Sequence, residues 1–314
     1  MKGKMIIALL LVSFMPVLFL LVKHRSFPKQ YDTTQPTADE ITDSVVTVNI
    51  KFDDGIRCIS LEEYIVNVVL AEMPVSFDLE ALKAQAVVAR TYTNYRIKKP
   101  KHEDAAVCTD HTCCQAYISI DDYLRYGGTQ QGVEKVKYAV MDTTGEVLTF
   151  QGSLIEATYF SCSGGRTEDA VAVWGTQVPY LQSVESPNEE NATHYMDTIS
   201  MTVTDFCEKL NIRHDDREIP TIGEITYTQG GGVAKIQISG KTYSGTKIRS
   251  LLGLYSTSFV ITVVGDQVII TTKGFGHRVG MSQYGADAMA VRGADYKQIL
   301  SHYYRGIELQ MMYS

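Results

Sequence analysis

The chain has 314 residues, 45% of them hydrophobic, which is enough apolar material for one large globular domain or two smaller ones. Its formal net charge at pH 7 is -7, from 29 basic and 36 acidic residues. A nucleic-acid-binding protein needs a clustered basic surface to neutralise phosphates, and because the balance of charge is acidic, with a pI near 5.5, we exclude that class.

The N-terminus contains an uncharged run from Met5 to Val22, with lysines on both sides. A helix of this length reaches roughly 27 Å at about 1.5 Å per residue, close to the thickness of a bilayer core. The pattern predicts a cytoplasmic tail at 1–4, a single N-terminal transmembrane helix at 5–22, a polar spacer at 23–43 and an extracytoplasmic domain at 44–314. A cleaved signal peptide is the alternative, and it also puts the body outside the cytoplasm.

The body begins with a strand at 45–52, predicted from alternating hydrophobic residues, and Asp53-Asp54-Gly55 predicts a hairpin turn after it. Two helices follow. The first begins after Ser60, which forms a capping-box pattern with Glu63, and it ends at Pro74. Its apolar stripe continues to the last turn, where Glu72 falls. Either this carboxylate lies against apolar surface, or the helix end frays and Glu72 points into water; the spacing leaves both open.

The second helix spans about 78–97, and Lys83 and Arg90 align on one of its faces. That face is either a solvated charged surface or one side of a groove beside Glu72. After residue 130 the pattern turns mainly to strands, at 146–150, 153–160, 225–229, 234–239, 259–264 and 267–273, with a β-rich subdomain at about 200–272. Helices are expected after Ser282 and at 296–304. The predicted fold class is α+β, with mixed helices and antiparallel β-sheet.

Five ordered blocks carry a family resemblance: LEEYIVNVVLAEMP at 61–74, EALKAQAVVARTY at 80–92, YFSCSGGRTEDA at 159–170, WGTQVPYLQSV at 174–184 and GFGHRVGMSQYGA at 274–286. In these blocks the chain resembles the stage II sporulation protein D family, membrane-anchored lytic transglycosylases of spore-forming bacteria. The resemblance covers about Val45 to Gly306, and long ordered blocks are more specific than any short motif.

The resemblance implies a peptidoglycan lytic transglycosylase, a carbon-oxygen lyase that cleaves the MurNAc-GlcNAc glycosidic bond of peptide-stripped strands and leaves 1,6-anhydroMurNAc ends. Glu72 matches the catalytic glutamate of the family. One carboxyl group can act as acid and then as base, and an apolar setting would help keep it protonated. For substrate binding we nominate Lys83, Arg90, Tyr159 and Tyr180, because cations suit lactyl carboxylates and aromatic rings suit sugars.

The resemblance also implies a cellular setting. The expected role is in sporulation, during engulfment of the forespore, at the mother-cell membrane of the engulfing septum. The expected partners are peptidoglycan glycan strands, the stage II sporulation protein P, an amidase, and the stage II sporulation protein M, a membrane scaffold. The alternative function is a non-catalytic glycan-binding module that stimulates a cell-wall amidase, as in the related amidase enhancers.

A second cluster gathers His102, Cys108, His111, Cys113 and Cys114 within 13 residues. Thiolates with imidazole suit tetrahedral zinc, whereas a disulfide or free buried thiols are the competing readings. Some family members carry a zinc site at this place, and that match implies His102, Cys108, Cys113 and Cys114 as ligands of a structural zinc, with Cys113 in place of a histidine and His111 as its rival. The other cysteines, Cys58, Cys162 and Cys207, are expected to be small core residues.

The loop at 274–280 contains His277, which we expect to support the site and not to carry the chemistry. In the family this loop frequently reads Gly-His-Gly-Val-Gly, and Arg278 stands here in place of the middle glycine. A side chain at that position argues against close approach of the loop backbone to a ligand.

Overall fold

The computed structural model describes residues 46–213 and 219–312, and Val45–Ser314 forms one compact unit. The predicted tail, transmembrane helix and spacer lie outside the described residues. Within the described ranges only α2 (Leu79–Lys98) has 18 residues or more, and it carries five charged side chains. A membrane-spanning helix needs about 20 predominantly apolar residues, so no described helix qualifies. We therefore correct the expected fold class and localisation: the described fold is α+β without a membrane-spanning helix.

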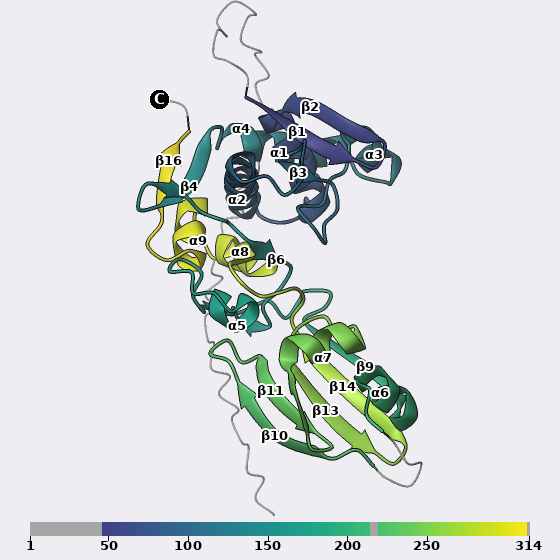
Figure 1. Cartoon of the computed structure of the whole chain (residues 1–314). Helices are drawn as coiled ribbons and strands as arrows, with labels where there is room; N and C mark the ends of the chain where they lie inside the picture. Colours follow the sequence, from purple (N-terminus) through teal and green to yellow (C-terminus); the bar gives the residue numbers. More distant parts are fainter. Residues whose placement is uncertain (1–45, 214–218, 313–314) are drawn as a thin grey trace, which may run out of the picture. The chain divides into compact units, whose positions relative to one another are not determined.

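The larger hydrophobic core is built around α2 (Figure 1). This helix packs against α1 (Leu61–Glu72), α4 (Gln130–Met141), α8 (Gln283–Val291), α9 (Tyr296–Tyr303) and β4 (Glu146–Phe150). Many of its buried side chains are alanines, which allow neighbouring elements to approach closely. Asp78 caps the helix by accepting a hydrogen bond from the Glu80 N–H, as its type predicts.

The start of α1 confirms the predicted boundary but not the predicted capping box. Ser60 is the N-cap residue, yet its side chain makes no capping hydrogen bond. The Leu61 N–H instead donates to the Val46 carbonyl at 2.8 Å. The preceding hairpin therefore satisfies one of the free N–H groups of the helix end.

Short sheets surround this core. β1 (Thr47–Phe52) pairs antiparallel with β2 (Gly55–Ser60), which confirms the predicted hairpin, and it pairs parallel with β3 (Val107–Cys108), which attaches the cysteine-rich loop to the sheet. β4 pairs with β16 (Glu308–Met311) and with β5 (Ser153–Leu154).

The single strand expected at 153–160 is wrong, because the chain leaves the β4–β5 hairpin and forms β6 (Tyr159–Phe160), which pairs with β15 (Met281–Ser282). This pairing places Tyr159 beside the start of α8. The remaining short elements are α3 (Ile120–Arg125), α5 (Ala170–Trp174), β7 (Gly165–Arg166) and β8 (Glu185–Ser186).

A second hydrophobic core lies in the segment that the sequence assigned to a β-rich subdomain. One of its sheets has the strand order β13 (Phe259–Val264), β14 (Gln267–Lys273), β9 (Met196–Thr202). The other has the order β10 (Ile222–Tyr227), β11 (Val233–Ile238), β12 (Lys241–Ser244). Two helices, α6 (Val203–Leu210) and α7 (Gly245–Leu252), pack on these strands, and the sequence pattern did not predict them.

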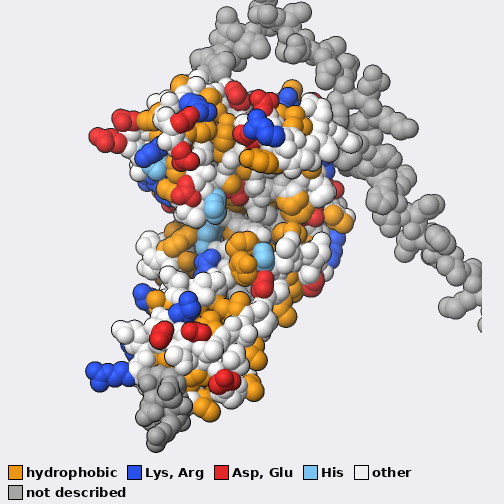
Figure 2. Space-filling view, turned by 90° about the vertical axis from the view of Figure 1, so that its right-hand side faces the viewer, with side chains coloured by type: hydrophobic (Ala, Val, Ile, Leu, Met, Phe, Trp, Pro, Cys, Tyr) orange, Lys and Arg blue, Asp and Glu red, His pale blue; other side chains and the backbone are white. Residues whose placement is uncertain are grey.

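Charged side chains of both signs are interspersed on the face shown in Figure 2, without one continuous basic surface. This distribution agrees with the exclusion of a nucleic-acid-binding protein that composition suggested.

Candidate active site

Glu72 is the last residue of α1, and its carboxylate is held from three directions. Oε1 accepts hydrogen bonds from the Ala116 N–H at 2.7 Å and from the Tyr159 hydroxyl at 3.0 Å. Oε2 lies 3.4 Å from Nε2 of Gln283, the first residue of α8. Three segments far apart in the sequence therefore meet at one carboxylate, and the side chain is not the frayed, solvated end that was the alternative.

Burial raises the pKa of the Glu72 carboxyl above its ordinary value near 4.5. Desolvation disfavours the charged form, while the hydrogen bonds from Ala116, Tyr159 and Gln283 favour it and lower the pKa. The net direction is upward, so desolvation outweighs the three donors. A carboxyl group tuned in this way exchanges a proton closer to neutral pH than a free glutamate does.

Tyr159 and Gln115 form a buried polar network beside Glu72. The Tyr159 hydroxyl also lies 3.2 Å from Oε1 of Gln115, so its single proton has two acceptors. The Gln115 amide nitrogen donates to the Tyr64 hydroxyl and to Thr93, which fixes its orientation. Tyr159 was nominated from the sequence, whereas Gln115, Ala116 and Gln283 were not. Their signals were the Gln-Ala pair directly after the two cysteines and the Gln in the block at 274–286.

The cysteine-rich loop forms a cluster that could hold a metal ion. The ligand atoms of His102, Cys108, Cys113 and Cys114 all lie within 4.8 Å of one another. Nε2 of His102 is 3.6 Å from the Cys114 sulfur and 3.8 Å from the Cys113 sulfur, and the two sulfurs are 3.8 Å apart. His111 is exposed and does not belong to this group of ligand atoms.

All six cysteines fall among the described residues, and all are free thiols. The competing disulfide between Cys108 and Cys113 or Cys114 is therefore not formed in this structure. Cys162 and Cys207 are buried, as expected of small core residues, but Cys58 is exposed. The reason is that Cys58 lies on β2, an edge strand whose residues are largely solvent-exposed.

The cysteine cluster and the Glu72 site share one stretch of backbone. Cys113 and Cys114 are followed immediately by Gln115, which holds Tyr159, and by Ala116, which donates to Glu72. Any displacement of the two thiols must therefore move two of the groups that position the carboxylate.

The two nominated cations are buried, and both form ion pairs with carboxylates that are partly exposed. Arg90 is fully buried, with its guanidinium hydrogen-bonded to both oxygens of Glu62 and to the carbonyls of Val140 and Glu146. Lys83 is 8% exposed and pairs with Glu80 and Asp142. A glycan carboxylate would have to displace these partners, so the geometry offers each cation a structural role, and substrate binding by either stays a prediction.

Tyr180 is half-buried, and its hydroxyl accepts a hydrogen bond from the Glu156 N–H. Its ring lies 5.6 Å from that of Phe150, and it makes no contact with Glu72. The structure thus brings only Tyr159, among the four nominated substrate residues, to the carboxylate.

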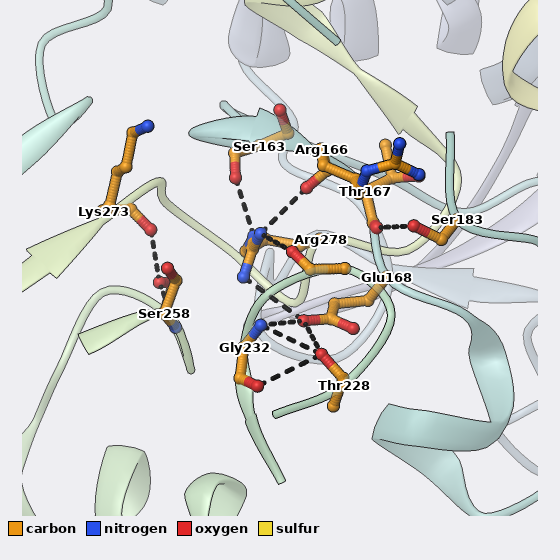
Figure 3. A network of polar contacts seen from close by, with 12 residues as sticks. Ser163, Arg166, Thr167, Glu168, Ser183, Thr228, Gly232, Ser258, Lys273 and Arg278 are labelled. Atoms are coloured by element: carbon orange, nitrogen blue, oxygen red, sulfur yellow. Dashed lines mark hydrogen bonds and ion pairs between the residues drawn. The ribbon is translucent and has the colours of Figure 1, made fainter. Parts of the chain in front are cut away.

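Arg278 adopts a left-handed backbone conformation, with φ +65°, in the loop where the family frequently has glycine. Its guanidinium forms an ion pair with Glu168 and donates to the carbonyls of Ser163, Arg166 and Gly230 (Figure 3). Glu168 in turn accepts hydrogen bonds from Thr228 and Gly232. Arg278 therefore ties the loop at 163–168 to the turn between β10 and β11.

Comparison with known proteins identifies the family of this chain. The chain is 39% identical over 281 residues to the stage II sporulation protein D of Bacillus amyloliquefaciens, covering 88% of this chain and 81% of that protein. It is 40% identical over 266 residues to the stage II sporulation protein D of Bacillus subtilis, covering 82% of this chain and 76% of that protein. This chain belongs to the stage II sporulation protein D family. The membership confirms the resemblance and, with it, a role in sporulation.

Two further similarities bear on the site. The family model described as "Stage II sporulation protein" matches residues 54–150 of this chain. This range contains Glu72, Gln115 and the whole cysteine cluster. A protein of Bacillus subtilis named "Amidase enhancer" is 32% identical and covers 76% of this chain, while the chain spans 39% of that longer protein.

Proposed function

We propose that this protein is a lytic transglycosylase of peptidoglycan, with Glu72 as both acid and base. The observation that carries the proposal is the setting of Glu72: a carboxyl group with a raised pKa, held by donors from three separate segments, in a family with a role in sporulation. The proposed substrate is the MurNAc-GlcNAc bond of peptide-stripped glycan strands.

The hydrogen bonds distinguish the two oxygens of Glu72. Oε1 has two close donors, Ala116 and Tyr159, whereas the contact of Oε2 with Gln283 is long. A substrate oxygen can replace Gln283 more easily than it can replace two short hydrogen bonds. Oε2 is therefore the atom assigned to proton transfer.

The reaction needs two proton transfers through one carboxyl group. In the first step protonated Glu72 gives its proton from Oε2 to the glycosidic oxygen, and the bond between that oxygen and the muramyl C1 breaks. In the second step the C6 hydroxyl of the same muramyl residue attacks C1, and the Glu72 carboxylate takes the hydroxyl proton. The product is a 1,6-anhydro ring, and the enzyme returns to its starting protonation state.

The groups that hydrogen-bond to Glu72 are compatible with this mechanism. A glycoside hydrolase usually needs a second carboxylate, as nucleophile or as base for water. The groups that contact the Glu72 carboxylate within the described ranges are an amide N–H, a phenol and a side-chain amide, and none of them is a carboxylate.

Zinc is the proposed metal of the cysteine cluster. A tetrahedral zinc with Zn–S distances of about 2.3 Å and a Zn–N distance of about 2.0 Å separates its sulfurs by about 3.8 Å and a sulfur from the nitrogen by about 3.5 Å. The observed separations of 3.8, 3.6 and 3.8 Å among Cys113, Cys114 and His102 fit this geometry. Four protein ligands leave no open position, so the proposed role is structural, and the cluster holds the Gln115–Ala116 segment against Glu72.

Mass spectrometry of glycan products tests the proposed reaction. We expect the wild type to release fragments with anhydromuramyl ends from peptide-free strands, and we expect Glu72→Gln to lose activity by at least about 100-fold, because an amide cannot exchange the proton. Glu80→Gln, a glutamate on α2 that pairs with Lys83, serves as the matched control. Reducing ends in place of anhydro ends would reassign the protein as a hydrolase, and full activity of Glu72→Gln would remove Glu72 from the chemistry.

The similarity to the amidase enhancer favours a second candidate function, a glycan-binding module that stimulates a cell-wall amidase. In that case amidase activity on peptidoglycan would rise when this protein is added, and Glu72→Gln would stimulate it as well as the wild type does. The proposed partners, the stage II sporulation proteins P and M, are tested by co-purification with the full chain.

A further inference from the structure

A hollow of about 160 Å³ lies between α8 and the loop at 187–195. The residues of α8 that line it share one face of the helix, with the spacing i, i+3, i+4 and i+7: Tyr284, Asp287, Ala288 and Val291. Asn188 and Asn191 line it from the loop, and Arg292 lines it where α8 ends. Complete ligand pockets usually span about 300–1,000 Å³, so a hollow of this size suits one unit of a longer ligand.

The hollow begins one residue after Gln283, whose side-chain amide contacts Glu72. Successive side chains on a helix point about 100° apart, so Gln283 is directed to the carboxylate while Tyr284 lines the hollow. The Tyr284 ring also lies 4.9 Å from the ring of Phe77, on the loop between α1 and α2. A glycan strand extends well beyond the bond that is cut, and its neighbouring sugars must rest on surface beside Glu72. This hollow is surface of that kind.

The loop that carries the two asparagines is anchored by Glu189, whose side chain is fully buried. Its Oε2 accepts hydrogen bonds from the Ser163 N–H at 2.7 Å, from the Ser163 hydroxyl at 2.8 Å and from the Gly164 N–H at 3.0 Å. Asn188 and Asn191 flank this anchor in the sequence. The loop wall is therefore held in place without a ligand, which lowers the ordering cost of binding.

The side chains in the hollow define the chemistry of its ligand. The carboxamides of the two asparagines can each donate and accept a hydrogen bond, as an N-acetyl group requires. Val291 is 71% exposed and offers apolar surface to a methyl group. Arg292 is exposed, and its guanidinium forms no ion pair with any residue at 46–213 or 219–312. Because a guanidinium matches a carboxylate in shape and charge, a ligand that satisfies all of these groups is an N-acetylated sugar that carries a carboxylate.

Asp287 is the one acidic group in the hollow, and it leaves room for an anionic ligand. Its Oδ1 accepts a hydrogen bond from the Asp78 N–H at 2.7 Å, at the start of α2. Five residues separate Asp287 from Arg292, which corresponds to about 7.5 Å of helical rise. A sugar can therefore place its carboxylate on the arginine and a hydroxyl donor toward the aspartate.

We propose that this hollow is a subsite for an N-acetylmuramyl residue next to the cleaved bond, with the N-acetyl group on the carboxamides of Asn188 and Asn191 and the lactyl carboxylate on Arg292. This inference rests on the proposed function, which supplies the glycan. It assigns recognition of the lactyl carboxylate to an exposed guanidinium, in place of the buried side chains of Lys83 and Arg90.

Calorimetry on the full chain carrying Glu72→Gln, which prevents turnover, tests the subsite. The protein is titrated with peptide-free muramyl glycan and, separately, with a chitooligosaccharide of the same length, which has N-acetyl groups but no carboxylate. We expect the muramyl glycan to bind about fivefold more tightly, the upper range for an exposed ion pair.

Variants in the same background assign the preference to its residues. Arg292→Gln is expected to make the two dissociation constants equal, whereas Arg305→Gln, which changes an exposed arginine outside the hollow, keeps the fivefold ratio. Asn191→Ala is expected to weaken both glycans about threefold to tenfold, and Asn49→Ala, an exposed asparagine on β1, is the control. Asn188 has a φ of +70°, so Asn188→Gly removes its carboxamide while keeping that backbone conformation.

These variants all replace exposed side chains, so we expect each of them to fold. The proposal is overturned if the background protein binds the two glycans equally or binds neither. It is also overturned if the fivefold ratio survives Arg292→Gln, or if Asn191→Ala and Asn188→Gly bind both glycans as tightly as the background does.

Product analysis separates this inference from the proposed reaction. If the wild type makes no anhydromuramyl ends but the calorimetry is as expected, the subsite stands and the reaction fails. If the wild type makes these ends and Arg292→Gln leaves the fivefold ratio unchanged, the reaction stands and the subsite fails.

Discussion

The backbone N–H of Ala116 donates to Oε1 of Glu72 at 2.7 Å, and Ala116 comes two residues after Cys114. A group that stabilises the carboxylate is thereby fixed by the loop whose thiols form the candidate metal site. Because an amide N–H cannot change its position without the chain around it, the geometry of Glu72 depends on how firmly residues 113–116 are held. The cysteine cluster thus has a consequence for the active site without taking part in the chemistry.

The raised pKa of Glu72 predicts a stability difference that depends on pH. In the unfolded chain the carboxyl ionises near 4.5, but in the folded chain it ionises at higher pH. The wild type therefore loses stability as pH rises from about 4.5 through the folded pKa, since the unfolded state releases its proton first. Glu72→Gln has no such proton, and its amide oxygen can still accept from Ala116 and Tyr159. We expect Glu72→Gln to have a higher urea midpoint than the wild type at pH 8 and an equal midpoint at pH 4. Equal midpoints at both values would show that the carboxyl is not desolvated.

Tyr159→Phe tests the hydroxyl that Glu72 shares with Gln115. The hydroxyl favours the carboxylate form and lowers the pKa of Glu72, so its removal is expected to raise that pKa. If protonated Glu72 starts the reaction, activity falls as pH rises through its pKa, and the variant should keep activity to higher pH than the wild type. The measurement is kcat/KM for glycan cleavage against pH. Tyr180→Phe, which removes a hydroxyl that does not contact Glu72, is the control and should leave the profile unchanged.

The position of Glu72 at the end of a helix could be predicted from the sequence because it depends on local spacing. Glu72 follows an apolar stripe at helical spacing, and the helix does end there. The ion pair of Arg90 could not be predicted in the same way, because its partner Glu62 lies on another helix. Only the packing of the two helices decides whether this cation faces a groove or a carboxylate. The helix α4 was missed for a related reason. Val133, Val136 and Val140 are β-branched residues that favour strands locally, and their burial against α2 overrides that preference.

The metal cluster predicts a specific pattern of cysteine replacements. Cys114→Ser removes a soft ligand from the cluster, and we expect it to reduce bound zinc well below one ion per chain and to lower the melting temperature. Cys58→Ser replaces an exposed thiol outside the cluster and should keep the zinc content and the melting temperature of the wild type. Zinc content is measured by elemental mass spectrometry on the purified full chain. A chelator should lower the melting temperature of the wild type and of Cys58→Ser, and it should have little further effect on Cys114→Ser. A zinc content that is the same in Cys114→Ser as in Cys58→Ser would contradict the assignment of the ligands.

Because the Ala116 N–H depends on the same loop, Cys114→Ser should also reduce glycan cleavage while Cys58→Ser does not. The physical reason is positional, since a misplaced amide no longer holds Oε1 of Glu72. Loss of zinc with unchanged kcat/KM would show that residues 115–116 are held without the metal.

Arg278→Gly restores the residue that the family frequently has in this loop, and two opposed effects decide its outcome. Glycine removes the strain of a left-handed arginine, a gain of about 1–2 kcal/mol. It also leaves Glu168, which is 1% exposed, without its cation, and an uncompensated buried charge costs about 3–5 kcal/mol. We therefore expect a net loss of about 1–4 kcal/mol in the free energy of unfolding, measured by urea denaturation. The double variant Arg278→Gly with Glu168→Gln should recover most of that loss, because no charge is left buried. If the single variant is as stable as the wild type, the ion pair between Arg278 and Glu168 stabilises the protein by no more than the left-handed backbone of Arg278 destabilises it.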